Sequence, residues 1–301
     1  MLDLGHELVL RAGHYCARLS AAGGARLTSL TWSGSGRPVD LLIPWQGQAR
    51  FNQHDWPKAG AFAMLPYSNR LAAGRFDWHG RPVQLATAVG ADHALHGFGH
   101  RKAWQVMDVS AYQATLAYRH APGDQGWPWP FQAALRFALD AHGIEVAITL
   151  TNIADQVAPA SLGWHPFHPL PDGNCGLRLH ARAMHDVGSD GLKRIRPGTA
   201  GGALREMPDW PAMPAPQTTA FEDWAGAYSL QLDPATRLVA RADGCPHLVV
   251  HVPPRQSHIC IEPVSLLPGA LHHNDMQALA AGAALDPGAT RRITWHCGVA
   301  T

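Results

Sequence analysis

The chain has 301 residues, of which 46% are apolar and 16% are charged. A chain of this length can bury a large core, as two ordinary domains or as one large β domain. The 24 basic and 23 acidic residues balance, which argues against a nucleic-acid partner or an acidic membrane surface and favours a neutral ligand. No stretch approaches the roughly 20 apolar residues of a membrane span, and the N-terminus lacks a signal-peptide pattern. We therefore predict a cytoplasmic protein.

Short alternating segments follow one another along the first half of the chain, as is typical of all-β proteins. They are HELVL, HYCARLS, GRFDWHGRPVQL, WQVMDVS and ATLAYR. In GRFDWHGRPVQL, His79-Gly80 marks a turn between two runs. The clearest segment is PFQAALRFALDAHGIEVAITLTN (130–152), where two alternating runs flank a D-A-H-G turn and predict a β-hairpin.

The second half of the chain continues this pattern with AYSLQLD, RLVARA, HLVVHV, HICIE and RRITWHCGV. The segment Arg196–Thr219 is rich in Pro, Gly and Ala and predicts one long surface excursion. Good helix formers gather only in Asp275–Leu285. We predict a single domain over residues 1–301, built as a large antiparallel β-sandwich with few short helices.

The five cysteines are scattered, odd in number and never spaced as C-x-x-C. This pattern indicates neither a disulfide framework nor a zinc knuckle. We interpret them as ordinary buried thiols.

The stretch HICIEPVS places a carboxylate, Glu262, at the end of a short apolar run. On a strand, Ile259 and Ile261 would face one way, and His258, Cys260 and Glu262 the other. The following Pro263 cannot donate to a ladder, which predicts a strand end beside a cleft. A solvent-exposed or ion-paired Glu262 is the alternative interpretation.

The segment SLGWHPFHPL holds His165 and His168 among aromatic residues and prolines. A histidine titrates near neutrality, so it can form a general acid–base pair with a carboxylate. On an extended chain the two histidines point in opposite directions, which makes a shared metal site a weak interpretation. With 19 histidines in the chain, a purely structural role remains the alternative for each.

Two further segments carry polar groups that suit sugar hydroxyls. Asn69 and Arg70 follow a proline-containing turn and offer several hydrogen-bond donors. His96 lies in ALHGFGHRKAW, where Gly97 and Gly99 allow close backbone approach. The eleven tryptophans fit carbohydrate recognition but are equally ordinary core residues.

Taken together and in this order, SNRLAAGRF, ALHGFGHRKAW, GWHPFHPL and CIEPVS resemble the aldose 1-epimerase (galactose mutarotase) family. The resemblance covers most of the chain. It implies a β-supersandwich with a sugar cleft, an isomerase that acts on a monosaccharide, and neither cofactor nor metal. It also implies that Glu262 is the general base and His165 the general acid, while Asn69, Arg70 and His96 hold the sugar.

The implied reaction opens the ring of an aldose and closes it to the other anomer. A base takes the proton of the anomeric hydroxyl while an acid protonates the ring oxygen. For Glu262 to act at neutral pH, burial should raise its pKa, and the nearby Arg70 should oppose this. We predict a modest net rise.

The sequence departs from the family pattern at two places. The acidic residue that the family usually carries before an F-x-x-W-x-G element falls near Thr218, and Glu222 or Asp223 would replace it only if the loop is shifted. We favour a solvated turn for both. Ser265 is followed by Leu266 where related sequences often have His, which predicts an altered set of hydroxyl contacts.

Two alternatives stay open. One is a non-catalytic sugar-binding or regulatory protein on the same fold. The other is a sugar-phosphate mutarotase, which would need clustered cations such as Arg70, Arg75, Arg101 and Lys102. In each case we expect a monomer or weak homodimer without nucleic-acid or membrane partners.

Overall fold

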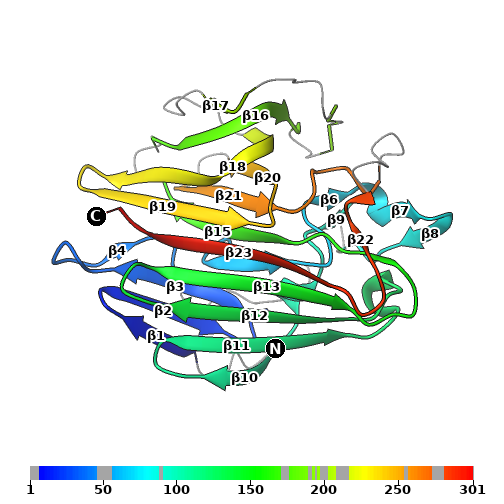
Figure 1. Cartoon of the computed structure of the whole chain (residues 1–301), viewed down its shortest axis with the longest axis horizontal. Coiled ribbons are helices and arrows are strands. Elements are labelled where there is room, and N and C mark those ends of the chain that lie inside the picture. Colours follow the sequence, from blue (N-terminus) through cyan, green and yellow to red (C-terminus); the bar gives the residue numbers. More distant parts are fainter. Residues whose placement is uncertain are drawn as a thin grey trace.

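The protein was analysed as a computed structural model that describes residues 7–45, 56–87, 91–170, 176–188, 192–193, 195–196, 203–207, 217–253, 257–272 and 281–300. These residues are almost entirely antiparallel β-strands (Figure 1). Three one-turn 3₁₀ helices interrupt the strands: η1 (Ala72–Gly74), η2 (Gly99–Arg101) and η3 (Asp124–Gly126). The predicted fold class, an all-β sandwich with few short helices, is confirmed.

One large sheet contains most of the strands, and it folds into two halves. The first half follows the pairing order β10 (Gln105–Val109), β11 (Gln113–His120), β12 (Phe131–Leu139), β13 (Ile144–Asn152), β23 (Thr290–Val299) and β19 (Thr236–Asp243). The second half follows the order β20 (His247–Val252), β21 (His258–Val264), β15 (Gly163–Pro169), β5 (Ala61–Met64), β3 (Arg26–Trp32), β2 (Tyr15–Ser20) and β1 (Leu8–Ala12).

A long strand, β18 (Gln217–Asp233), joins the two halves. Its first part pairs with β20 and its last part pairs with β19. Three further strands extend the large sheet: β16 (Arg178–Asp186) pairs with β18, β17 (Arg205–Glu206) with β16, and β4 (Val39–Asp40) with β3. The other described strands form separate two-stranded pairs: β6 (Arg70–Leu71) with β9 (Ala94–Leu95), β7 (Arg75–Trp78) with β8 (Arg81–Gln84), and β14 (Ala158–Pro159) with β22 (Ala284–Leu285).

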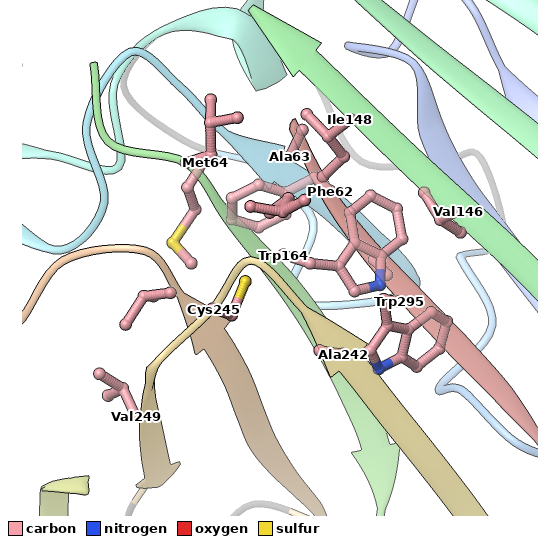
Figure 2. Packing of buried hydrophobic residues seen from close by; sticks show 14 of the residues in the cluster. Phe62, Ala63, Met64, Val146, Ile148, Trp164, Ala242, Cys245, Val249 and Trp295 are labelled. Carbon is pink, nitrogen blue, oxygen red and sulfur yellow. The ribbon is translucent and has the colours of Figure 1, made fainter. Parts of the chain in front are cut away.

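The two halves pack face to face around an aromatic core. Trp164 of β15 and Trp295 of β23 lie with ring centroids 5.9 Å apart, and Figure 2 shows them beside Val146 and Ile148. The indole N–H of Trp295 donates to the hydroxyl of Tyr228 on β18. One face of β15 is therefore committed to the core, which leaves its other face for the site described below.

Both predicted turns are present. The hairpin of β12 and β13 pairs Phe131 with Asn152, and His79-Gly80 connects β7 to β8. The sequence analysis missed β3, β5 and β16. Strand β5 is buried at all four residues and so shows no alternation, while β16 alternates Arg and His with small residues, which gives a weak apolar signal.

The predictions for two segments need correction, and parts of both segments lie outside the described residues. The predicted surface excursion Arg196–Thr219 ends too late, because Thr218 and Thr219 are buried within β18; residues 197–202 and 208–216 lie outside the described residues. Of the predicted helix Asp275–Leu285, residues 275–280 lie outside them, and Ala284–Leu285 forms β22. None of the helices in the described part of the chain is long and apolar enough to cross a membrane.

The cysteine prediction is confirmed in part. Cys245, Cys260 and Cys297 are buried free thiols, and Cys16 is half-buried. Cys175 lies outside the described residues.

Candidate active site

A cavity of about 300 Å³ lies over strands β18, β20, β21 and β15. All five residues that the sequence predicts for the site line it: Asn69, Arg70, His96, His165 and Glu262. The other lining residues are Trp56, Lys58, Leu95, Phe167, Thr218, His251, Pro253, His258 and Cys260. Segments far apart in the sequence thus supply one compact site.

Strand β21 alternates as its sequence predicts. His258, Cys260 and Glu262 line the cavity, whereas Ile259 and Ile261 are fully buried and project from the opposite face of the strand. The alternative of a solvent-exposed Glu262 is wrong, because its side chain is only 3% exposed.

The register of β15 against β21 brings the acid–base candidates together. Phe167 pairs with Cys260, and two residues further along the same register His165 lies opposite Glu262. Opposed side chains of an antiparallel pair share one face and lie at contact distance. Two largely apolar strands therefore create a polar pair.

The strand end predicted at Pro263 lies one residue later. Strand β21 continues through Pro263, which pairs with Leu248 of β20, and ends at Val264, while Glu262 lines the cavity as predicted. Around His165 and Glu262, the described strands β15 and β21 are not paired with each other. Pro166 and Pro263 both lie in this unpaired stretch. Because proline has no N–H, the ladder opens locally between two continuing strands.

The paired side chains are close and nearly dry. His165 Nε2 lies 3.2 Å from Glu262 Oε1, with side chains 8% and 3% exposed. Phe62 and Phe167 each stack against the imidazole with ring centroids 4.6 Å away. Among the described residues, Glu262 Oε2 and His165 Nδ1 have no hydrogen-bond partner. Both groups therefore keep polar capacity for a ligand.

Burial drives both groups toward their neutral forms. It raises the pKa of Glu262 to about 8, against an opposing effect of the Arg70 charge. It also lowers the pKa of His165 well below 6.5, helped by the neighbouring His96. The rise at Glu262 exceeds the modest one predicted, because almost no solvent reaches the carboxyl. At neutral pH the pair therefore holds one exchangeable proton.

The side wall of the cavity is fixed by reciprocal hydrogen bonds. The backbone N–H of Asn69 donates to His96 Nδ1 (3.2 Å), and the N–H of His96 donates to the carbonyl of Asn69 (3.0 Å). Because Nδ1 accepts, a neutral His96 carries its proton on Nε2. Asn69 Oδ1 accepts from the N–H of Arg70 (2.8 Å), which leaves the Asn69 amide nitrogen as a donor.

His96, His165 and Glu262 also offer three possible metal-ligand atoms within 4.8 Å of one another. A ligating imidazole nitrogen must present a lone pair. In His96 the Nδ1 lone pair already accepts a backbone N–H, so Nε2 is the protonated atom. The fixed tautomer suits hydrogen-bond donation and opposes metal ligation.

Several lining residues were missed by the sequence analysis. Trp56 and Lys58 belong to no motif, and the Lys58 ammonium lies 3.8 Å from the Trp56 ring centroid. Thr218 Oγ1 and His251 Nδ1 are 2.8 Å apart. The alternation of HICIE already placed His258 on the face of Glu262, whereas the alignment of His251 with that face depends on the register of β20 against β21.

The structure shows where the residues that depart from the family pattern lie. Thr218, near the expected acidic position, lines the cavity. Glu222 and Asp223 are not among its described lining residues, and the turn predicted for them is wrong because both belong to β18; Glu222 contacts His185 at 3.0 Å. Leu266 is a buried core residue and is not among the described lining residues of the cavity, so the altered hydroxyl contacts stay a prediction.

A family model described as Aldose 1-epimerase matches residues 6–195, more than half of the chain. The chain belongs to the aldose 1-epimerase family. The matched region contains Asn69, Arg70, His96 and His165, whereas Glu262 lies beyond it.

The curated relatives are distant. YphB of Escherichia coli K12, an uncharacterized protein, is 34% identical over 113 residues, 37% of this chain and 38% of its own length. YihR of the same organism, also uncharacterized, is 30% identical over 54% of this chain and 50% of its length. An aldose 1-epimerase of Escherichia coli K12 is 28% identical over 38% of this chain and 33% of its length. The chain thus spans half or less of each relative.

Solved structures support the fold. A galactose mutarotase-like protein from Clostridium acetobutylicum matches with a TM-score of 0.78 at 16% identity, over 97% of this chain and 94% of that protein. One from Lactobacillus casei matches with a TM-score of 0.72 at 17% identity, over 98% and 100%. The fold is therefore galactose mutarotase-like.

The turn after His96 gives a first prediction. Gly97 has φ +65°, and a Cβ there would lie 2.0 Å from the carbonyl oxygen of Leu65. Gly97→Ala should lower the free energy of unfolding by about 3 kcal/mol or more. Gly80, with φ +78° and open space around it, is the control: Gly80→Ala should cost only about 1–2 kcal/mol. Equal losses in urea unfolding would contradict the steric argument.

Burial of Glu262 gives a second prediction. Between the ordinary pKa of 4.5 and the folded value of about 8, the folded protein binds one more proton than the unfolded chain, so this group's stabilising contribution falls as pH rises. Glu262→Gln removes that dependence. The melting temperature of the variant, relative to wild type, should therefore rise from pH 5 to pH 8.5. Parallel curves in thermal scans would refute the burial argument.

Proposed function

We propose that this protein interconverts the α and β anomers of an aldose. The observation that carries the proposal is the buried contact between His165 and Glu262 in a cavity of sugar-binding size. Family membership supports it, and the distant relatives leave the exact reaction to experiment.

The chemistry requires two proton movements at one carbon. Glu262 takes the proton of the anomeric hydroxyl, the bond from the anomeric carbon to the ring oxygen breaks, and His165 protonates that oxygen. Rotation about the bond between the first two carbons and reclosure, with both protons returned, give the other anomer. The two oxygens are attached to the same carbon, so the groups that serve them must be neighbours.

The proton count of the pair suits this cycle. An ionised Glu262 with a protonated His165 starts ring opening, and a neutral pair remains when the aldehyde forms. Both distributions contain one exchangeable proton. Burial favours the neutral pair in the empty cavity, and hydroxyl donors of a bound sugar would stabilise the carboxylate. The steps involve protons only, which is why we propose no cofactor.

Substrate positioning is proposed for Asn69, Arg70 and His96. The Nε2–H of His96, the amide nitrogen of Asn69 and the guanidinium of Arg70 are donors on the cavity wall. Donors of this kind match the lone pairs of ring and hydroxyl oxygens. The predictions of a cytoplasmic location and of a monomer or weak homodimer stand beside this proposal.

The catalytic roles predict a pattern of mutant rates. Glu262→Gln and His165→Asn should each slow anomer exchange by about 10²–10⁴-fold, while sugar binding, followed by tryptophan fluorescence, should persist. Glu145→Gln and His180→Asn are matched controls at residues that are not among the described lining residues of the cavity, and they should keep the wild-type rate. Polarimetry on freshly dissolved α-D-glucose and α-D-galactose, or exchange NMR, measures the rate.

Different results would have distinct meanings. Wild-type rates in Glu262→Gln would overturn its role. If no aldose exchanges faster with wild-type protein while sugars still change the fluorescence, the protein is a sugar-binding module on this fold.

The one-proton requirement also predicts the pH profile. We expect kcat/KM to fall above about pH 8, as the pair loses its proton, and to stay level down to pH 6.5, because the pKa of His165 lies well below that value. Rates at pH 5–9.5, corrected for uncatalysed exchange, test this. A rate that rises through pH 8 would mean that ionised Glu262 acts beside a neutral His165.

A further inference from the structure

The charges on the cavity wall are unequal. Lys58 and Arg70 line it, and Glu262 is the one acidic residue among its described lining residues. Burial keeps Glu262 largely protonated at neutral pH, so the wall is net positive there. Burial is the main cause of the lowered pKa values of His165 and His251, and the Lys58 charge is among the neighbouring charges that lower them further.

The position of Lys58 is built into the fold. Arg26, which is fully buried, donates from one guanidinium nitrogen to the carbonyls of Pro57 (3.2 Å) and Ala59 (2.7 Å). These two carbonyls flank Lys58 on either side. Burying an arginine costs solvation free energy. Its hydrogen bonds hold the backbone on both sides of Lys58, which is exposed at the cavity rim.

Arg70 lines two neighbouring cavities. A second cavity of about 290 Å³ shares Trp56, Arg70 and Leu95 with the first and adds Arg101 and His93, together with Asp92. A group that extends from the sugar ring can therefore reach past Arg70 without leaving the protein surface.

The other cations that the sequence suggested are engaged elsewhere. Arg75 donates to Gln84 (2.5 Å), and Lys102 forms an ion pair with Asp124 (2.6 Å). Neither is among the described residues that line the two cavities. The cationic wall is thus a specific arrangement and does not reflect the composition of the chain, whose charges balance.

We propose, on the basis of the proposed function, that the aldose accepted by this site carries an anionic substituent, which Lys58 and Arg70 bind at the cavity rim. A hydroxyl of a neutral sugar can accept a hydrogen bond from these cations. A phosphate or carboxylate accepts the same hydrogen bonds and adds the Coulombic attraction between opposite charges, which a neutral oxygen lacks.

Exchange NMR at anomeric equilibrium tests the proposal without the need for pure anomers. The gluco series comprises D-glucose, D-glucuronate and D-glucose 6-phosphate, and the galacto series comprises the corresponding sugars. After subtraction of uncatalysed exchange, we expect kcat/KM of an anionic sugar to exceed that of its neutral parent at least tenfold and to fall with ionic strength. The carboxylate and phosphate arms distinguish the two kinds of anion.

Variants connect the preference to the residues. Lys58→Met should lower the anionic-to-neutral ratio of kcat/KM about tenfold, as expected for one lost charge-assisted contact. Lys102→Met is the matched control and should leave the ratio unchanged. Melting temperatures check that both variants fold.

The outcomes separate the two proposals. Anomer exchange that is as fast for glucose or galactose as for any anionic sugar overturns the anionic substrate and leaves the mutarotase proposal intact. An unchanged ratio in Lys58→Met overturns the role of Lys58. If no sugar exchanges faster with protein, the proposed function itself fails.

Discussion

The site depends on the register between β15 and β21. That register sets His165 opposite Glu262 and holds both side chains on the face turned away from the aromatic core. Because side chains alternate along a strand, a slip of one residue would turn His165 toward the core and bring Trp164 to the cavity. The packing of Trp164 against Trp295 opposes such a slip. The core thereby keeps His165 and Glu262 opposite each other.

Burial of Glu262 costs stability and would favour the proposed reaction. A carboxyl that is 3% exposed has its pKa raised to about 8, which gives a group that can exchange protons near neutrality. The same desolvation disfavours its ionised form in the folded state. His165 and Glu262 keep unsatisfied polar atoms among the described residues, and a bound hemiacetal would supply the missing partners.

The cavity combines a rigid floor with a wall from another part of the chain. The floor consists of neighbouring strands of one sheet, in which Thr218 pairs with His251 and His251 with Cys260. The wall brings Lys58 and the reciprocal pair of Asn69 and His96. In the proposed function, proton transfer and ring binding would stay constant while residues of the wall, above all Lys58, would set which substituent is accepted.

The sequence alone determined the all-β class, the hairpin of β12 and β13, and the polar face of HICIE, because alternation of side chains is a local property. Family motifs selected all five predicted residues that line the cavity. Only the tertiary structure decided that β21 continues through Pro263, that Thr218 belongs to a strand, and that Lys58 faces the site. These features depend on which strands pair and on a buried arginine that positions a segment 31 to 33 residues away, and long-range contacts leave no periodic pattern in the sequence.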